Sequence, residues 1–196
     1  MTFGGVVFLL VLIGLIAAII LTYNKLVGLR QRSEEAWSDI DVQLKRRTDL
    51  VPNLVETVKG YATQEKSVLT AVVEARAKAT QVKLDASQLT DPDKVKAFQD
   101  AQNQLTGALG RLLAVSENYP DLKSNANFLA LQSQLEGTEN RIAVARRDYI
   151  EAVRTYNTAL RTFPTVIWAK TAFSGNKPMA EFTATEGSEK PPQVKF

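Results

Sequence analysis

An unbroken apolar run near the amino end constrains this chain more than any other feature of its sequence. Residues 3–23 contain no charged side chain, and a helix of that length spans roughly 30 Å, the thickness of the hydrocarbon core of a bilayer. A buried core helix normally keeps one polar stripe, whereas residues 6–21 are almost wholly aliphatic. The run therefore predicts a transmembrane helix, with residues 1–24 as a membrane anchor.

The flanks of this run favour a retained anchor over a cleaved signal peptide. A signal peptide carries basic residues before a shorter apolar region and small residues at its cleavage site, and neither is present here. Lys25, Arg30 and Arg32 follow the run. The positive-inside rule then predicts a single-pass protein of the cell (inner) membrane, with the N-terminus outside and the bulk of the chain in the cytoplasm. Because Glu34 and Glu35 dilute the basic cluster, a periplasmic-facing orientation is the alternative.

The composition argues against several classes of functional site. The 196 residues include no cysteine and no histidine, which removes thiolate chemistry, the commonest general base and the usual ligands of zinc and iron. The net charge of +3 is spread along the chain, which argues against a nucleic-acid partner. We therefore predict a protein that is not an enzyme, with no catalytic residue, no cofactor and no metal, although carboxylate-only chemistry stays open in principle.

Beyond the anchor, apolar residues recur at intervals of three and four along three long stretches. These stretches cover residues 37–82, 95–119 and 128–163, and such seams are typical of amphipathic helices that pack against a partner. Pro52 falls inside the first stretch and is expected to kink or break its helix near residues 49–51. Three amphipathic helices joined by short connections pack as antiparallel neighbours.

The sequence thus predicts an all-α protein in which residues 25–173 form an elongated antiparallel helical bundle of three long helices. Residues 165–173 are long enough to form one short fourth helix. Residues 174–196 contain glycine and paired prolines and predict an extended tail. Phe182, Val194 and Phe196 give this tail apolar residues with which to dock on the bundle, and a frayed tail is the equal alternative.

The polar residues singled out by the pattern are expected to have structural or interface roles. Arg47 interrupts the first apolar seam. In the third seam, Glu136 and Glu139 lie on either side of two small residues, at positions 137 and 138. We expect an ion-pair network that joins Arg46 or Arg47 to one of these carboxylates, within the bundle or between subunits; the alternative is an arginine that extends its charged end to water. The candidate residues are Trp37, Ile40, Leu44, Arg46, Arg47, Asp49, Pro52, Asn53, Glu136, Glu139 and Arg141.

The predicted first helix is much longer than the second, so part of its apolar stripe has no predicted partner in the chain. Trp37, Ile40 and Leu44 lie on that stripe, and exposed apolar patches usually mark contacts. We therefore expect a homo-oligomer with the 37–58 face at the subunit contact. The alternative is that the tail at residues 182–196 folds back and covers the stripe.

Several strings of the sequence are specific enough to identify a family; they lie at residues 23–27, 36–47, 49–55, 58–61, 112–115, 117–123, 127–129, 135–142 and 156–157. These strings resemble the LemA family of bacterial membrane proteins, and the resemblance covers roughly residues 20–173. It implies a single N-terminal membrane helix and an antiparallel helical bundle, without an established catalytic activity or a defined ligand. The chain departs from the family pattern at Gln64, where histidine is common, and at Ile150, where asparagine is common.

These observations favour a membrane-anchored scaffold or assembly protein that acts through homo-oligomerisation and partner binding. Its expected partners are the lipid bilayer, further copies of the chain and other membrane proteins. One apolar span cannot enclose a transport pathway by itself. The alternative function is an enzyme or ligand-binding module with a polar site between helices, near Arg46, Arg47 and Asp49 and the carboxylates of Glu136 and Glu139.

Overall fold

The computed structural model describes residues 3–182, and all regular structure in that range is helical. This confirms the prediction of an all-α helical bundle. The elements are α1 (Phe3–Tyr61), α2 (Lys66–Gln81), the short 3₁₀ helix η1 (Ala86–Gln88), α3 (Pro92–Val115), the 3₁₀ helix η2 (Ser116–Asn118), α4 (Pro120–Lys123), α5 (Ala126–Arg161) and α6 (Thr165–Lys170).

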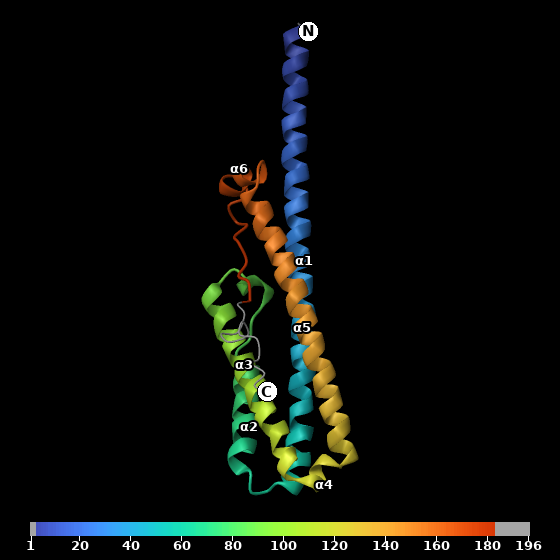
Figure 1. Ribbon diagram of the computed structural model, residues 1–196. Helices are drawn as coiled ribbons and strands as arrows, with labels where there is room; N and C mark the ends of the chain where they lie inside the picture. The colour runs from blue at the N-terminus through green and yellow to red at the C-terminus, as the bar shows by residue number, and fades with distance from the viewer. Residues whose placement is uncertain (1–2, 183–196) are drawn as a thin grey trace, which may run out of the picture.

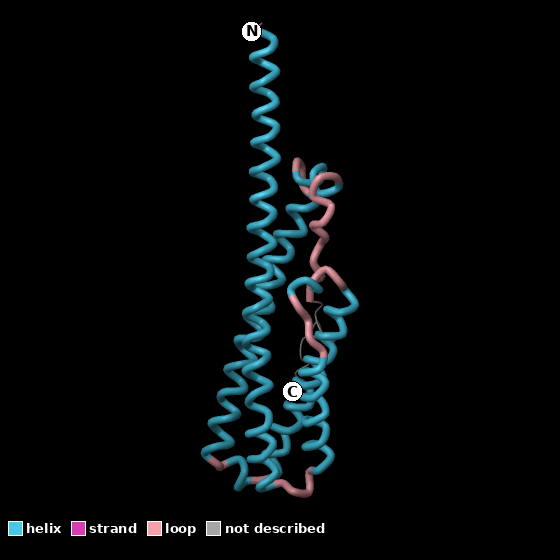
Figure 2. Tube along the Cα trace, turned by 180° about the vertical axis from the view of Figure 1, so that it is seen from behind, coloured by secondary structure: helices cyan, strands magenta, loops and turns pink. Residues whose placement is uncertain are grey.

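Four of these helices are long, and they alternate in direction along an elongated body (Figures 1 and 2). Helices α1 and α5 form the most extensive pair, and the α2–α3 hairpin packs beside the end of the bundle that is remote from the N-terminus. Short helix α6 lies at the opposite end, where α5 finishes beside α1. The bundle is therefore four helices thick at one end and thinner at the other.

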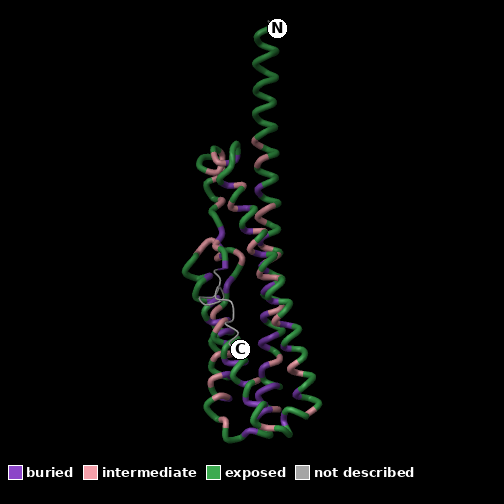
Figure 3. Tube along the Cα trace, in the orientation of Figure 1, coloured by how far each residue is buried: buried purple, intermediate pink, exposed green. Residues whose placement is uncertain are grey.

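The N-terminal part of α1 projects beyond the bundle with its side chains exposed (Figure 3). The helix contains an 18-residue window with a mean hydropathy of 3.0, none of which is buried, so it is long and apolar enough to cross a membrane. Leu26 is the first buried residue of α1. A core helix of a soluble domain would bury such a surface, so this exposure supports a membrane-associated protein.

The predicted first helix over residues 37–82 is two helices, so that part of the prediction was wrong. Helix α1 ends at Tyr61 and α2 begins at Lys66, and the amide of Glu65 donates to the Ala62 carbonyl at 3.1 Å within the turn. Val58 and Val72 lie on opposite sides of this turn and are buried in one apolar cluster. The three-four spacing continued through the turn because both helices direct apolar residues into the same core.

Pro52 does not end α1, although the sequence predicted a kink or break there. Proline has no amide hydrogen, so the carbonyl of Thr48, four residues earlier, loses its helical donor. The guanidinium of Arg76, on α2, donates from Nε to that carbonyl at 3.1 Å. Pro52 itself is exposed. A side chain from the neighbouring helix thus replaces the missing backbone hydrogen bond and lets α1 continue.

Replacing Arg76 with leucine is expected to lower the free energy of unfolding by about 1–2 kcal/mol, since the Thr48 carbonyl loses its donor. The same replacement in a Pro52→Ala background should cost much less, because the alanine amide then supplies the hydrogen bond. Chemical denaturation of the four proteins in this double-mutant cycle measures the coupling. Equal costs in both backgrounds would show that Arg76 does not compensate for Pro52.

The apolar stripe at Trp37, Ile40 and Leu44 is buried within the chain itself, so the expectation of an uncovered stripe was wrong. The rings of Phe98 and Tyr149 lie 5.2 and 6.0 Å from the Trp37 ring, edge to face. The Phe182 ring stacks on it from the C-terminal segment, at 6.1 Å. The stripe is therefore covered by α3, α5 and the segment that returns from α6.

This returning segment is held to α5 by hydrogen bonds as well as by packing. The side chain of Asn157 accepts from the Met179 amide at 2.9 Å and donates to the Met179 carbonyl at 2.9 Å. The hydroxyl of Tyr149 donates to the Ala180 carbonyl at 3.0 Å, and the Ala180 amide donates to the Leu89 carbonyl at 2.8 Å. The tail thus docks at least as far as Phe182; Val194 and Phe196 lie outside the described residues.

Candidate functional site

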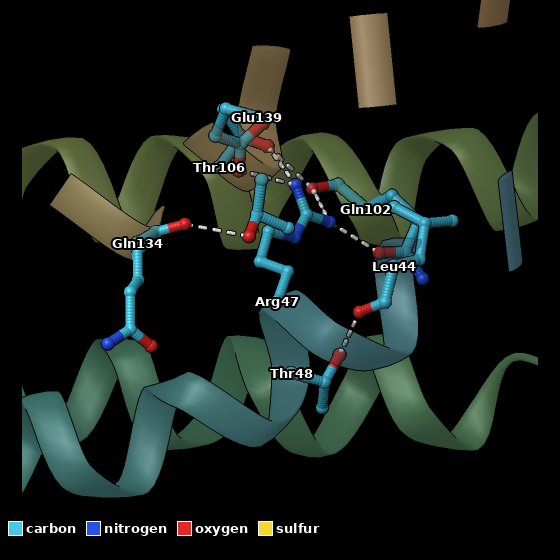
Figure 4. A network of polar contacts seen from close by, with 8 residues as sticks. Leu44, Arg47, Thr48, Gln102, Thr106, Gln134 and Glu139 are labelled. Atoms are coloured by element: carbon cyan, nitrogen blue, oxygen red, sulfur yellow. Dashed lines mark hydrogen bonds and ion pairs between the residues drawn. The ribbon is translucent and has the colours of Figure 1, made fainter. Parts of the chain in front are cut away.

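A network of polar side chains centred on Arg47 lies in the interior of the bundle (Figure 4). Arg47 lies on the buried seam of α1 and has 0% exposure. Its Nη1 donates to Glu139 Oε1 at 3.0 Å and to Thr106 Oγ1 at 2.7 Å. Its Nη2 donates to the side-chain oxygen of Gln102 and to the Gln102 carbonyl. Of the ion pairs expected of Arg46 or Arg47, the structure shows the one between Arg47 and Glu139, within the chain.

Gln102 extends this network to the fourth long helix. Its amide nitrogen donates to the Ala79 carbonyl of α2 at 3.2 Å, so hydrogen bonds link α1, α2, α3 and α5 at one level. A buried cation is strongly destabilising unless paired and hydrogen-bonded. Because a rotation or shift of one helix would leave this buried cation unpaired, the pairing of Arg47 favours the observed arrangement of the four helices.

The chemistry of this network is that of a structural ion pair. A guanidinium presents five N–H donors in a fixed planar geometry, which suits it to pair with carboxylate and carbonyl oxygens. Both terminal nitrogens of Arg47 already donate to the chain's own oxygens. Only its Nε is buried without a hydrogen-bond partner among the described atoms. These contacts favour a structural role over the alternative of a ligand or catalytic site near Arg47 and Glu139.

A second arginine lies close to this network and contacts the docked tail. The guanidinium carbon of Arg146 lies 5.7 Å from the centre of the Phe182 ring, in the range of a cation–π contact. Burial lowers the pKa of Arg146, the positive charge of Arg47 lowers this pKa further, and Glu139 opposes both. Glu139 is therefore paired with Arg47 and also acts electrostatically on Arg146, which contacts Phe182 of the tail.

Most of the other candidate residues on α1 and α5 lie on the surface, away from the polar network around Arg47. Arg46, Asp49, Pro52 and Asn53 are exposed on α1. Glu136 is also exposed, and it accepts a hydrogen bond from Gln132 at 3.0 Å. Of the predicted set, only Arg47 and Glu139 are paired with each other, while Trp37, Ile40 and Leu44 lie in the apolar core.

Sequence reasoning missed Gln102, Thr106 and Arg76, although a signal for the first was present. Gln102 lies four residues after Phe98 and three before Leu105, so it occupies a seam position of the second predicted stretch. A polar residue on one seam opposite an arginine on another indicates a buried pair. Arg76 carried no such signal, because its partner is a backbone carbonyl.

The outer side of the α1–α5 pair carries a shallow groove of about 370 Å³, lined by residues of both helices. Ala36 and Ala145 lie within it, next to Val144, which is 47% exposed. Arg141, another predicted candidate, also lines this groove. The side-chain oxygen of Gln43 is buried there without a hydrogen-bond partner among the described residues. A helix with small residues can approach such a surface closely.

Comparison with known proteins places these features in a family. The sequence pattern of the LemA family matches residues 36–196. The chain is 28% identical to magnetosome protein MamQ 2 of Paramagnetospirillum magneticum, over 90% of this chain and 70% of that protein. It is 25% identical to magnetosome protein MamQ of Magnetospirillum gryphiswaldense, over 78% of this chain and 62% of that protein.

Protein LemA of Metamycoplasma hominis is also 25% identical, over 71% of this chain and 60% of that protein. The chain therefore spans less than two thirds of the lengths of these last two relatives. The LemA pattern itself begins ten residues after the first buried position of α1 and runs through the whole bundle. Since the match covers far more than half of the sequence, the chain belongs to the LemA family.

Proposed function

We propose that this protein is a single-pass membrane-anchored scaffold that works through self-association and the binding of other membrane proteins, without catalysis. One observation carries this proposal: α1 runs without interruption from an unburied apolar segment into the core of the bundle. A continuous helix transmits the position of its membrane segment to everything packed on it. Family membership and relatives named as magnetosome proteins fit a membrane-associated protein of this kind.

The bundle is proposed to lie on the cytoplasmic side of the inner membrane, with the N-terminus outside. Lys25, Arg30 and Arg32 follow the apolar segment, and basic residues that flank a membrane helix favour the cytoplasmic side. A reporter active only in the cytoplasm should be active when fused after Phe196, and a reporter active only in the periplasm should be inactive there. The reverse result would place the bundle in the periplasm.

Self-association is proposed to use the outer groove of α1 and α5, because the stripe at Trp37 is already covered. Anchors in one membrane hold all copies in the same orientation and raise their effective concentration. Exposed Val144 would then lie between parallel copies.

Replacing Val144 with glutamate is expected to convert the oligomer to monomers in mild detergent, since the charge would be buried without a partner at the proposed contact. Val73→Glu is the matched control, because Val73 is a similarly exposed valine on α2, at 52% against 47%. Light scattering of the purified full-length proteins gives their masses. If Val144→Glu retains the wild-type oligomer mass, or if the wild type is monomeric at every concentration, this surface is wrong.

A further inference from the structure

Two stretches of the chain near the apolar segment are rich in basic residues. The whole chain is nearly balanced, with 24 basic and 21 acidic residues, yet residues 1–33 and 152–180 contain no aspartate or glutamate. The basic residues of these two stretches are Lys25, Arg30, Arg32, Arg154, Arg161, Lys170 and Lys177. Arg30 is paired with Glu34 at 2.9 Å; for the other six, the structure shows no ion pair among residues 3–182.

The fold places α6 and the end of α5 beside the part of α1 that follows the apolar run (Figure 1). The rings of Tyr23 on α1 and Phe173 after α6 lie 5.0 Å apart. A groove of about 590 Å³ joins the stretches, and its lining includes Leu21, Lys25 and Arg154. Leu21 ends the aliphatic run and Lys25 is the first charge after it, so this groove lies where the hydrocarbon core of a membrane would end.

Large apolar side chains are exposed at the same level. Phe163, in the turn before α6, is 79% exposed and lines the groove. Ile167 on α6 is 49% exposed, and Trp168 beside it is partly buried. In water, these residues would expose apolar area next to a row of cations. Aromatic and aliphatic side chains flanked by lysine and arginine are the composition of segments that lie in the interface of an anionic bilayer.

We propose that α6 and its flanking turns, residues 162–173, dock on the surface of the bilayer that α1 crosses, with anionic phospholipid headgroups in the groove beside Lys25 and Arg154. Phe163 and Ile167 enter the interfacial layer, and Arg161 and Lys170 attract the negative lipid charge. This inference rests on the proposed membrane anchoring. A second contact beside the anchor stops the bundle from rotating about α1 and fixes which face of α1 and α5 meets a neighbouring protein.

The absence of cysteine makes a direct test simple. Single-cysteine variants Leu12→Cys, Ile167→Cys and Val73→Cys of the full-length chain carry a nitroxide label, and each is reconstituted in vesicles of phosphatidylcholine with or without phosphatidylglycerol. Relative accessibility to oxygen and to a water-soluble nickel complex reports the depth of each label. Leu12 lies in the apolar segment and Val73 on the remote α2. Their labels therefore serve as references for a position in lipid and a position in water.

With phosphatidylglycerol present, the Ile167 label should be several-fold less accessible to nickel than the Val73 label, and adding Arg161→Glu and Lys170→Glu should remove most of that protection. An Ile167 label as accessible as the Val73 label, with Leu12 in lipid, would overturn the docking and leave the anchor intact. A water-accessible Leu12 label would instead show that the anchoring itself fails. Equal protection in both kinds of vesicle would overturn the role of anionic lipid.

Discussion

Replacing Glu139 with leucine is expected to lower the free energy of unfolding by about 3 kcal/mol, because it leaves a buried guanidinium without its countercharge. The Arg47 side chain is 0% exposed, whereas that of Glu139 is 34% exposed. Water can therefore reach the carboxylate but not the cation. Loss of the Glu139 carboxylate is therefore expected to destabilise the fold more than loss of the Arg47 cation. Urea denaturation of the full-length protein in detergent, followed by circular dichroism, measures the cost.

Glu136→Leu is the matched control, since Glu136 lies three residues earlier on α5 and bonds only to Gln132 among the described residues. It should change the stability by about 0.5 kcal/mol or less, as exposed substitutions usually do. The double variant Arg47→Met with Glu139→Leu should recover most of the loss, because an apolar pair then replaces an uncompensated charge. Equal effects of Glu139→Leu and Glu136→Leu would show that the buried pair contributes nothing.

Replacing Ile142 with aspartate should unfold or disorder the bundle, with a cost of several kcal/mol for a carboxylate buried without a partner. Ile142 is 2% exposed in the apolar cluster that also contains Trp37 and Tyr149. Leu129→Asp is the control on the same helix, because Leu129 is half exposed. Helicity and the melting temperature of both variants are compared by circular dichroism. Unchanged melting of Ile142→Asp would contradict the assignment of the α5 seam.

The α5 seam shows which parts of this fold can be predicted from sequence. Leu135, Ile142, Tyr149 and Tyr156 recur every seven residues, and all four are buried on one helix. Periodicity fixes the buried face as long as the helix is continuous. It does not reveal a chain reversal that preserves the spacing, and for that reason the turn between α1 and α2 was missed.

The continuation of α1 through Pro52 was not predicted, and docking of the tail was one of two equal alternatives, for different physical reasons. The effect of a proline on a helix depends on whether a donor reaches the freed carbonyl, and here that donor is Arg76, on another helix. An extended segment has no helical period, and the tail is held by individual hydrogen bonds from Asn157 and Tyr149. Both outcomes depend on tertiary contacts that local sequence does not encode.

The part of the candidate site that lies on the apolar seams of the helices could be predicted from the sequence. The position of Arg47 on the α1 seam indicated that it is buried or extends to water, and its pairing with a carboxylate near residue 138 was expected. Whether Glu136 or Glu139 supplies that carboxylate depends on which flank of α5 faces α3. The structure places Glu139 on that flank, where Arg47 also reaches Thr106 of α3.

The proposed assembly of anchored chains through the outer groove of α1 and α5 is tested most directly by crosslinking in native membranes. Val144→Cys is the sole cysteine of such a chain, and Val73→Cys serves as its control. After mild oxidation, Val144→Cys should give a disulfide-linked dimer on a non-reducing gel, and Val73→Cys should stay monomeric. If Val144→Cys remains monomeric while its thiol reacts freely with a maleimide, copies of the chain do not meet at this surface.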